Sequence, residues 1–191
     1  MPKRFPTIST LVALVLFSMT ALAAELVPTP LRSAIIVRSA GYERGFADRS
    51  GEATLAVVAG KSGPSAEDGQ AMVLVFSKLL RETKISGRKT RVVQVTHESA
   101  SKTVSELKNQ RAEVVYFARG LEDIVKDVPM RESGFARLLV CANGGDMGEG
   151  CTLGVELAGQ KPRLVLNVKQ ANAAGLRFDP QFLRLARIVR K

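Results

Sequence analysis

Apolar positions along the chain follow two patterns, continuous short runs and helical spacing, and together these patterns predict an α/β fold. Ala53–Gly60, Ala112–Gly120 and Phe135–Ala142 are almost continuously apolar, which is typical of strands that are covered on both faces. A fourth strand, Thr90–Thr96, is expected after a turn. Apolar residues recur at helical spacing in other segments, which predicts helices over Leu31–Tyr42, Gln70–Thr83, Lys102–Gln110 and, more briefly, 121–128.

The order of these segments indicates how they are arranged in space. Strands alternate with helices, which predicts a mostly parallel sheet with helices on both faces. The stretch 61–69, "KSGPSAEDG", is expected to be the loop between the first strand and its helix. Thr152–Leu157 and Arg163–Val168 flank the turn "AGQKP", so an antiparallel strand pair is expected near the C-terminus.

A last helix is expected from Asp179 to the end of the chain, because Asp179 is a good N-cap and Pro180 suits the first helical position. Its apolar stripe comprises Phe182, Leu185, Ala186 and Val189. The remaining arc carries the basic residues Arg184, Arg187 and Arg190. This pattern fits a docked helix with a solvated basic face, or a basic face that meets an acidic partner.

The N-terminus has the features of a secretory signal peptide. Lys3 and Arg4 precede the apolar run Leu11–Met19, and the small residues Ala21 to Ala23 predict cleavage near Ala23. The run is short for a bilayer core of about 30 Å, and no cysteine follows it for lipid attachment, so no stable membrane anchor is expected. We therefore expect an exported chain, with residues 1–23 as signal peptide and residues 24–191 as one α/β domain.

The chain is basic, with 28 Lys and Arg residues, 18 Asp and Glu residues and a formal net charge of +10. Removal of the signal peptide, which contains Lys3 and Arg4, lowers the formal net charge of the remaining chain to +8. This charge favours acidic partners or anionic head groups. Export and the lack of aromatic residues interleaved with the basic ones argue against nucleic acid as the partner.

Residues that could perform catalysis are scarce. His97 is the only histidine and is expected in a loop, so Ser–His–Asp and Cys–His arrangements have little to build on. Two cysteines and one distant histidine lack a fourth zinc ligand. The glycine-rich stretches 59–69 and 142–150 match neither nucleotide-binding motif. We therefore expect that the protein is not an enzyme and that it needs no cofactor.

The two cysteines, Cys141 and Cys151, enclose the glycine-rich stretch "ANGGDMGEG". In an exported protein they are expected to form a disulfide, which a short loop between two strands allows. Its spacing is wider than that of a redox C-x-x-C motif, which favours a structural role. Asp146 and Glu149 in the same stretch could bind a hard cation, or simply solvate the turn.

The segment Cys151–Val189 resembles the YfiR-like family of exported proteins. In that family a glycine-containing strand leads through a turn to an R-hydrophobic-x-hydrophobic-N strand, an alanine-rich turn ending in Gly-Leu, and "LLRLAR". The matching positions here are Gly154, Arg163, Asn167, Ala171, Gly175, Leu176, Leu183, Leu185, Ala186 and Arg187. The earlier strands and helix fall in the family's order, so the resemblance covers most of the mature chain and is specific from Cys141 onward.

The resemblance implies a periplasmic, non-enzymatic and often dimeric protein with an α/β sandwich fold. Such proteins restrain a membrane-bound diguanylate cyclase by binding its periplasmic sensor region, which lowers cyclic-di-GMP output and biofilm formation. It also implies that the disulfide state can modulate the restraint. Two departures, the missing second disulfide and the replacement of an aromatic-Pro segment by Tyr42–Gly51, mean that the partner's identity does not carry over.

Some of the matching residues have simple structural roles. Asn167 could cap the helix that starts near Lys169, although a ligand role stays open. Gly175 is expected to adopt a left-handed conformation at a helix end. Arg163 could pair with Glu156 across the predicted hairpin.

Two functions remain in competition at this stage. The first is a regulator that binds an inner-membrane signalling protein, either a diguanylate cyclase or a sensor kinase. The alternative is a small-molecule-binding periplasmic protein that serves a transporter or sensor kinase, with its ligand at the carboxyl ends of the parallel strands. Those ends correspond to the loops "GKSGPS", "HESAS", "ARG" and "ANGGD".

Overall fold

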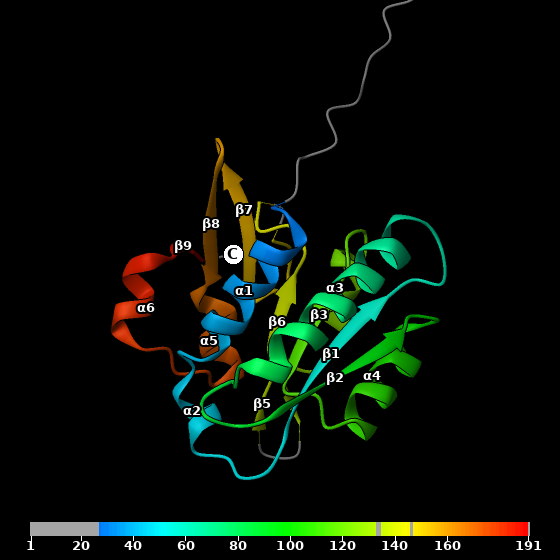
Figure 1. Cartoon of the computed structure of the whole chain (residues 1–191), viewed down its shortest axis with the longest axis horizontal. Coiled ribbons are helices and arrows are strands. Elements are labelled where there is room, and N and C mark those ends of the chain that lie inside the picture. Colours follow the sequence, from blue (N-terminus) through cyan, green and yellow to red (C-terminus); the bar gives the residue numbers. More distant parts are fainter. Residues whose placement is uncertain (1–26, 133–134, 146, 191) are drawn as a thin grey trace, which may run out of the picture.

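A seven-stranded sheet forms the centre of the molecule, with the strand order β2-β1-β3-β6-β7-β8-β9 (Figure 1). The computed structural model describes residues 27–132, 135–145 and 147–190, so the predicted signal peptide lies outside the described residues. All neighbouring strands in this sheet are parallel except β7 and β8, which form an antiparallel hairpin. The strands are β1 (Ala53–Ala59), β2 (Thr90–Thr96), β3 (Val114–Phe117), β6 (Leu138–Cys141), β7 (Leu153–Ala158), β8 (Lys161–Asn167) and β9 (Arg187–Val189). The predicted fold class is therefore confirmed.

Helices cover both faces of the sheet. They are α1 (Thr29–Ala40), α2 (Arg44–Ala47), α3 (Gly63–Glu82), α4 (Ala100–Asn109), the 3₁₀-helix η1 (Glu122–Asp127), α5 (Val168–Ala174) and α6 (Pro180–Leu185). Helices α1 and α3 lie side by side over one face (Figure 1), while α4 and η1 pack on the other. None of the helices in the described ranges is long and apolar enough to cross a membrane.

The alternation of side chains along the buried strands produces two hydrophobic cores. Leu55 and Val57 of β1 point to the core beneath α1 and α3. Ala56 and Val58 point to the core beneath α4 and η1. Every residue of β1 is buried, which explains why this strand is continuously apolar.

The predicted loop at 61–69 is wrong, because α3 already begins at Gly63. Pro64 suits the first turn of a helix, so it did not indicate a loop there. Gly69 lies against β1, where an added Cβ would overlap the Cβ of Ala59. The missing side chain of Gly69 therefore allows α3 to pack closely on β1, and the residue does not form a turn.

The predicted strand Phe135–Ala142 is divided in two. Phe135–Ala136 forms β5, which pairs with β4 (Arg131–Glu132) in a small separate sheet. Arg137 interrupts the run with a buried side chain, and its guanidinium donates to the carbonyls of Ala112 and Pro129 at 3.1 Å each. The main sheet resumes with β6.

The predicted C-terminal helix is also wrong beyond Leu185. Ala186 has extended backbone angles, and Arg187–Val189 forms β9 beside β8. The β-branched residues Ile188 and Val189 suit a strand, and Val189 packs against the second core. The helical spacing of the apolar residues therefore does not predict the structure beyond Leu185, because the chain is extended from Ala186 onward.

Candidate partner-binding surface

Glu156 connects the last three strands of the sheet. It lies opposite Arg163 in the β7–β8 hairpin, and the Nε of Arg163 donates to its Oε1 at 2.7 Å. Arg187 of β9 donates from Nε to Oε1 at 2.9 Å and from Nη2 to Oε2 at 2.8 Å. These bonds, that from Arg187 first and that from Arg163 next, lower the pKa of Glu156 against the opposing effect of burial. The Arg163–Glu156 pair expected from the sequence is present, and Arg187 joins it.

The basic residues expected on one helical face differ in their exposure and in their ion pairing. Arg184 is exposed on α6, and Arg190 is exposed just after β9. Arg187 is half-buried and engaged by Glu156, so its charge is already compensated. The sequence did not reveal this pairing because it depends on β9 being a strand.

Exposed apolar side chains gather at the C-terminal end of the chain. Leu183, Leu185 and Ile188 are 39%, 67% and 38% exposed, and they are three of the five large apolar residues exposed in the described ranges. The strand β9 stands at the end of the sheet order, so its outer edge pairs with no strand of the described chain. We call Leu183, Arg184, Leu185, Ile188 and Arg190 the C-terminal surface.

The helix α6 that carries this surface is firmly held. The side chain of Asp179 accepts a hydrogen bond from the backbone N–H of Gln181 at 2.8 Å, which caps the helix. Phe182 is buried, stacks on Phe178 at 4.8 Å between ring centroids, and also contacts Tyr42 at 5.4 Å. The exposed leucines therefore project from a fixed support.

Other family-motif residues have structural roles. The Asn167 side chain accepts from the backbone N–H of Gln170 at 3.3 Å and caps α5. Gly175 ends α5 with a φ of 75°, a conformation that favours glycine, and Leu176 is buried after it. Gly154 lies against Gly144, and a Cβ added at Gly154 would come 2.6 Å from the Cα of Gly144.

Cys141 and Cys151 are joined by a disulfide with a Cα–Cα distance of 5.9 Å, inside the usual range. Both residues are fully buried in the core beneath α4 and η1, which limits the access of reductants. Glu149 is exposed in the loop they enclose, and Asp146 lies outside the described residues.

His97 lies in the loop after β2, as expected, with its Nδ1 2.9 Å from the Thr103 hydroxyl. No cluster of three or more metal-ligating side chains occurs in residues 27–132, 135–145 and 147–190.

The carboxyl edge of the parallel strands, where a small ligand was considered, holds a carboxylate of the protein itself. Asp68 of α3 forms an ion pair with the buried Arg32 of α1. Its Oδ2 accepts from the Tyr116 hydroxyl at 2.8 Å and from the backbone N–H of Arg119 at 3.1 Å. The neighbouring Gly69 is packed against the ends of β1 and β3, so this part of the edge is filled.

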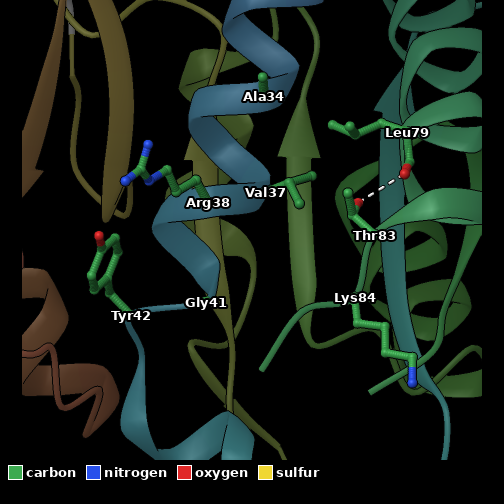
Figure 2. Close-up of a pocket in the computed structure, with 8 residues that line it drawn as sticks. All are labelled: Ala34, Val37, Arg38, Gly41, Tyr42, Leu79, Thr83 and Lys84. Carbon is green, nitrogen blue, oxygen red and sulfur yellow. Dashed lines mark hydrogen bonds between the residues drawn. The ribbon is translucent and has the colours of Figure 1, made fainter. Parts of the chain in front are cut away.

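A second surface feature is an open groove between the C-terminal halves of α1 and α3, with a volume of about 370 Å³. Figure 2 shows Val37 of α1 and Leu79 of α3 pointing toward each other across it. The lining residues are Ala34, Val37, Arg38, Gly41, Tyr42, Leu79, Thr83 and Lys84. The floor is thus apolar and two cations lie at its margins.

These features define an α/β domain that exposes apolar and basic surfaces. The chain matches the model of the YfiR/HmsC-like family over residues 30–187 and belongs to that family. Membership implies a regulator of a diguanylate cyclase in a family that is regulatory, non-catalytic and periplasmic. The disulfide is consistent with export.

The comparison with curated proteins finds no match. Among solved structures the chain is similar to the ABC domain in complex with L-Trp from Streptococcus pneumonia, with 12% sequence identity and a TM-score of 0.57. The match covers 85% of this chain, and the chain spans 62% of that structure. At this identity the similarity shows the fold alone.

Proposed function

We propose that this protein restrains a membrane-bound diguanylate cyclase by binding the cyclase's periplasmic sensor region. The restraint lowers cyclic-di-GMP output and thereby biofilm formation. The protein acts by stoichiometric association and without turnover. The family match over residues 30–187 and the buried disulfide support this proposal.

The observation that carries the proposal is the C-terminal surface. Three of the five large apolar side chains exposed in the described ranges lie within residues 183–188, and concentrations of exposed apolar groups often mark interaction sites. Leu185 is 67% exposed on a helix held by the buried Phe182, so this exposure belongs to the folded state. The neighbouring Arg184 and Arg190 and the basic net charge favour an acidic sensor surface. The outer edge of β9 also offers backbone groups for an added strand.

Binding inhibits the cyclase only if the protein prefers one conformation of the sensor over the other. A rigid surface suits this task, because a preorganised binding site loses little conformational entropy on association. Glu156 of the β7–β8 hairpin binds Arg187 of β9 and so keeps this part of the surface in place.

The test is deletion of the gene in its host, followed by measurement of cyclic-di-GMP. The concentration is expected to rise on deletion and to return when the wild-type gene is restored. Leu185→Glu is expected to fold but not to restore it. Leu74→Glu is the matched control, because Leu74 is also 67% exposed but lies on α3.

Two further measurements complete the test. The wild-type protein is expected to retain the cyclase's periplasmic region in a pull-down, and the Leu185→Glu variant is expected to lose it. Unchanged cyclic-di-GMP on deletion, together with no inner-membrane cyclase or kinase retained, would contradict the proposal.

The alternative, a receptor for a small molecule, has less support. Asp68 fills the sheet edge between β1 and β3, where ligands of such folds commonly bind. A thermal-shift screen with amino acids, nucleosides and anions separates the two functions. A specific stabilisation by one compound would favour the receptor.

A further inference from the structure

We propose that the groove between α1 and α3 binds an acidic amphipathic helix of the partner protein, in addition to the contact at the C-terminal surface. This inference rests on the proposed function, because it assigns a second contact to the same partner. It commits to a protein segment whose apolar stripe enters the groove and whose acids flank that stripe.

The shape and composition of the groove fit one apolar side chain of a helix. Ala34, Val37 and Leu79 provide an apolar floor, and the volume of about 370 Å³ is larger than the engineered cavity of about 150 Å³ that accepts benzene. Val37 and Leu79 face each other across the gap (Figure 2). An aromatic or leucine side chain therefore has room to lie between the helices.

The groove is fixed before any partner arrives. Arg32 in the first turn of α1 forms an ion pair with Asp68 of α3, and Asp68 also accepts from Tyr116 of β3. This buried cluster joins both helices to the sheet at the end of the helices away from the groove. Because the helices cannot readily spread or close, a partner side chain finds a preformed site.

The charges at the margins select an acidic partner. The charged residues near the C-terminal ends of the two helices are four cations, Arg38, Lys78, Arg81 and Lys84, and one acid, Glu82. Within the described part of the chain, none of these four cations has a hydrogen-bond or ion-pair partner. The helix C-termini contribute roughly half a negative charge each, which does not cancel the excess of three positive charges.

Figure 2 shows Arg38 on the side of α1 away from α3, and Lys84 below Thr83, past the C-terminal end of α3. Cations next to both helices of an apolar groove match a helix that carries acids beside its apolar stripe. A second copy of this basic chain would bring like charges together, so it is disfavoured as the occupant.

The groove is also continuous with the C-terminal surface. Tyr42 lines the groove and contacts Phe182 of α6, with 5.4 Å between the ring centroids. The neighbouring residue Leu183 belongs to the C-terminal surface. Tyr42 therefore joins the groove to the buried side chain that supports the C-terminal surface, and one partner can contact both.

The experiment measures binding of the full mature protein to the periplasmic region of the host's cyclase. Arg38→Glu/Lys84→Glu reverses the marginal charges, and Ala34→Trp fills the groove from an exposed position. Each variant is expected to weaken binding by about tenfold or more. Lys89→Glu/Lys126→Glu, the same charge change at exposed lysines elsewhere, is expected to change it by less than about threefold.

A photocrosslinking residue at position 34 identifies the occupant. The captured peptide is expected to come from the cyclase and to carry acids around an apolar stripe. Capture of a second copy of this chain, or of a basic or featureless segment, would overturn the inference.

The outcomes separate this inference from the proposed function. Failure of the wild-type protein to bind the cyclase would remove the proposed function itself. Wild-type binding that survives both groove variants unchanged, while Leu185→Glu abolishes it, would leave the proposed function standing and remove the groove.

Discussion

Glu156 and Arg187 are joined by two hydrogen bonds although strand β8 lies between their strands. Arg187 belongs to a strand of three residues at the edge of the sheet, and so short a strand has few backbone bonds to hold it. Arg163 shares the same carboxylate from the intervening strand. The cluster therefore acts as a side-chain clamp over the last three strands.

Glu156→Gln tests this clamp. We expect a loss of about 1–2 kcal/mol in the free energy of unfolding at neutral pH, because glutamine is uncharged and offers the two guanidinium groups one acceptor oxygen where the carboxylate offers two. Hydrogen exchange of the β9 amides should accelerate more than that of the β1 amides, since β9 loses its anchor while β1 does not. Urea unfolding and native-state hydrogen exchange measure the two effects.

The pH dependence of the same variant has a definite sign. The folded-state pKa of Glu156 is lowered, so its contribution to stability is present above its unfolded pKa of about 4.3 and lost as pH falls through the folded pKa. The difference between wild type and Glu156→Gln should therefore shrink below about pH 4. Glu149→Gln, which changes an exposed acid, is the control and should not show this pH-dependent difference. A constant difference down to low pH would contradict the clamp.

Gly154→Ala should be clearly destabilising. The added methyl group would come 2.6 Å from the Cα of Gly144 and push the cysteine loop off β7. Overpacking of this kind costs typically about 1–3 kcal/mol. Gly148→Ala, in the loop between the two cysteines, is the matched control, because no atom lies within 4 Å of its added Cβ. Equal chemical denaturation midpoints for the two variants would show that the loop can move freely.

Removing the disulfide with Cys141→Ala/Cys151→Ala should lower the free energy of unfolding. Release of a loop with a sequence separation of 10 residues corresponds to about 2.5–3 kcal/mol in the chain-entropy treatment. Guanidinium unfolding with and without reductant measures it, and reductant should leave the variant unchanged. Mass spectrometry of the untreated wild type should show a chain lighter by two hydrogen atoms; free thiols there would contradict the pairing.

The same variant tests a regulatory role for the disulfide. Burial of both sulfurs slows reduction in the folded protein, so the restraint of the cyclase should change little when reductant is added for a short time. A rapid rise in cyclic-di-GMP under reductant, absent in the variant, would instead make the bond a redox switch.

Much of the sheet could be predicted from the sequence, because the buried parallel strands β1 and β3 are continuously apolar. Thr90–Thr96 coincides with β2, and the hairpin turn correctly placed Arg163 opposite Glu156. Local chemistry also sufficed for the caps, since Asn167 and Gly175 act through residues close to them in the chain.

The failures have long-range causes. No glycine or proline follows Leu185 to signal the end of α6, and the strand β9 is favoured by its pairing with β8 and by Glu156, both distant in sequence. The glycine at position 69 suggested a loop, but it permits α3 to approach β1. The groove between α1 and α3 depends on how two helices are packed, which periodicity does not reveal.

Substitutions in the buried cluster of Arg32, Asp68 and Tyr116 are expected to cause the largest losses in the free energy of unfolding. Asp68→Asn removes the negative charge that compensates the guanidinium of Arg32, a residue only 1% exposed whose Nε and Nη1 have no hydrogen-bond partner in the described structure. Loss of one member of a buried ion pair costs about 3–5 kcal/mol. Tyr116→Phe removes only one hydrogen bond and should cost about 1–2 kcal/mol.

A double variant identifies the cause of that loss. In Arg32→Met/Asp68→Asn no charge of this cluster is left buried, so much of the stability lost in Asp68→Asn should return. Urea unfolding of the wild type, both single variants and the double variant gives the coupling energy. If Asp68→Asn and the double variant are equally unstable, the loss comes from the packing of α3 on the sheet and not from the uncompensated charge of Arg32.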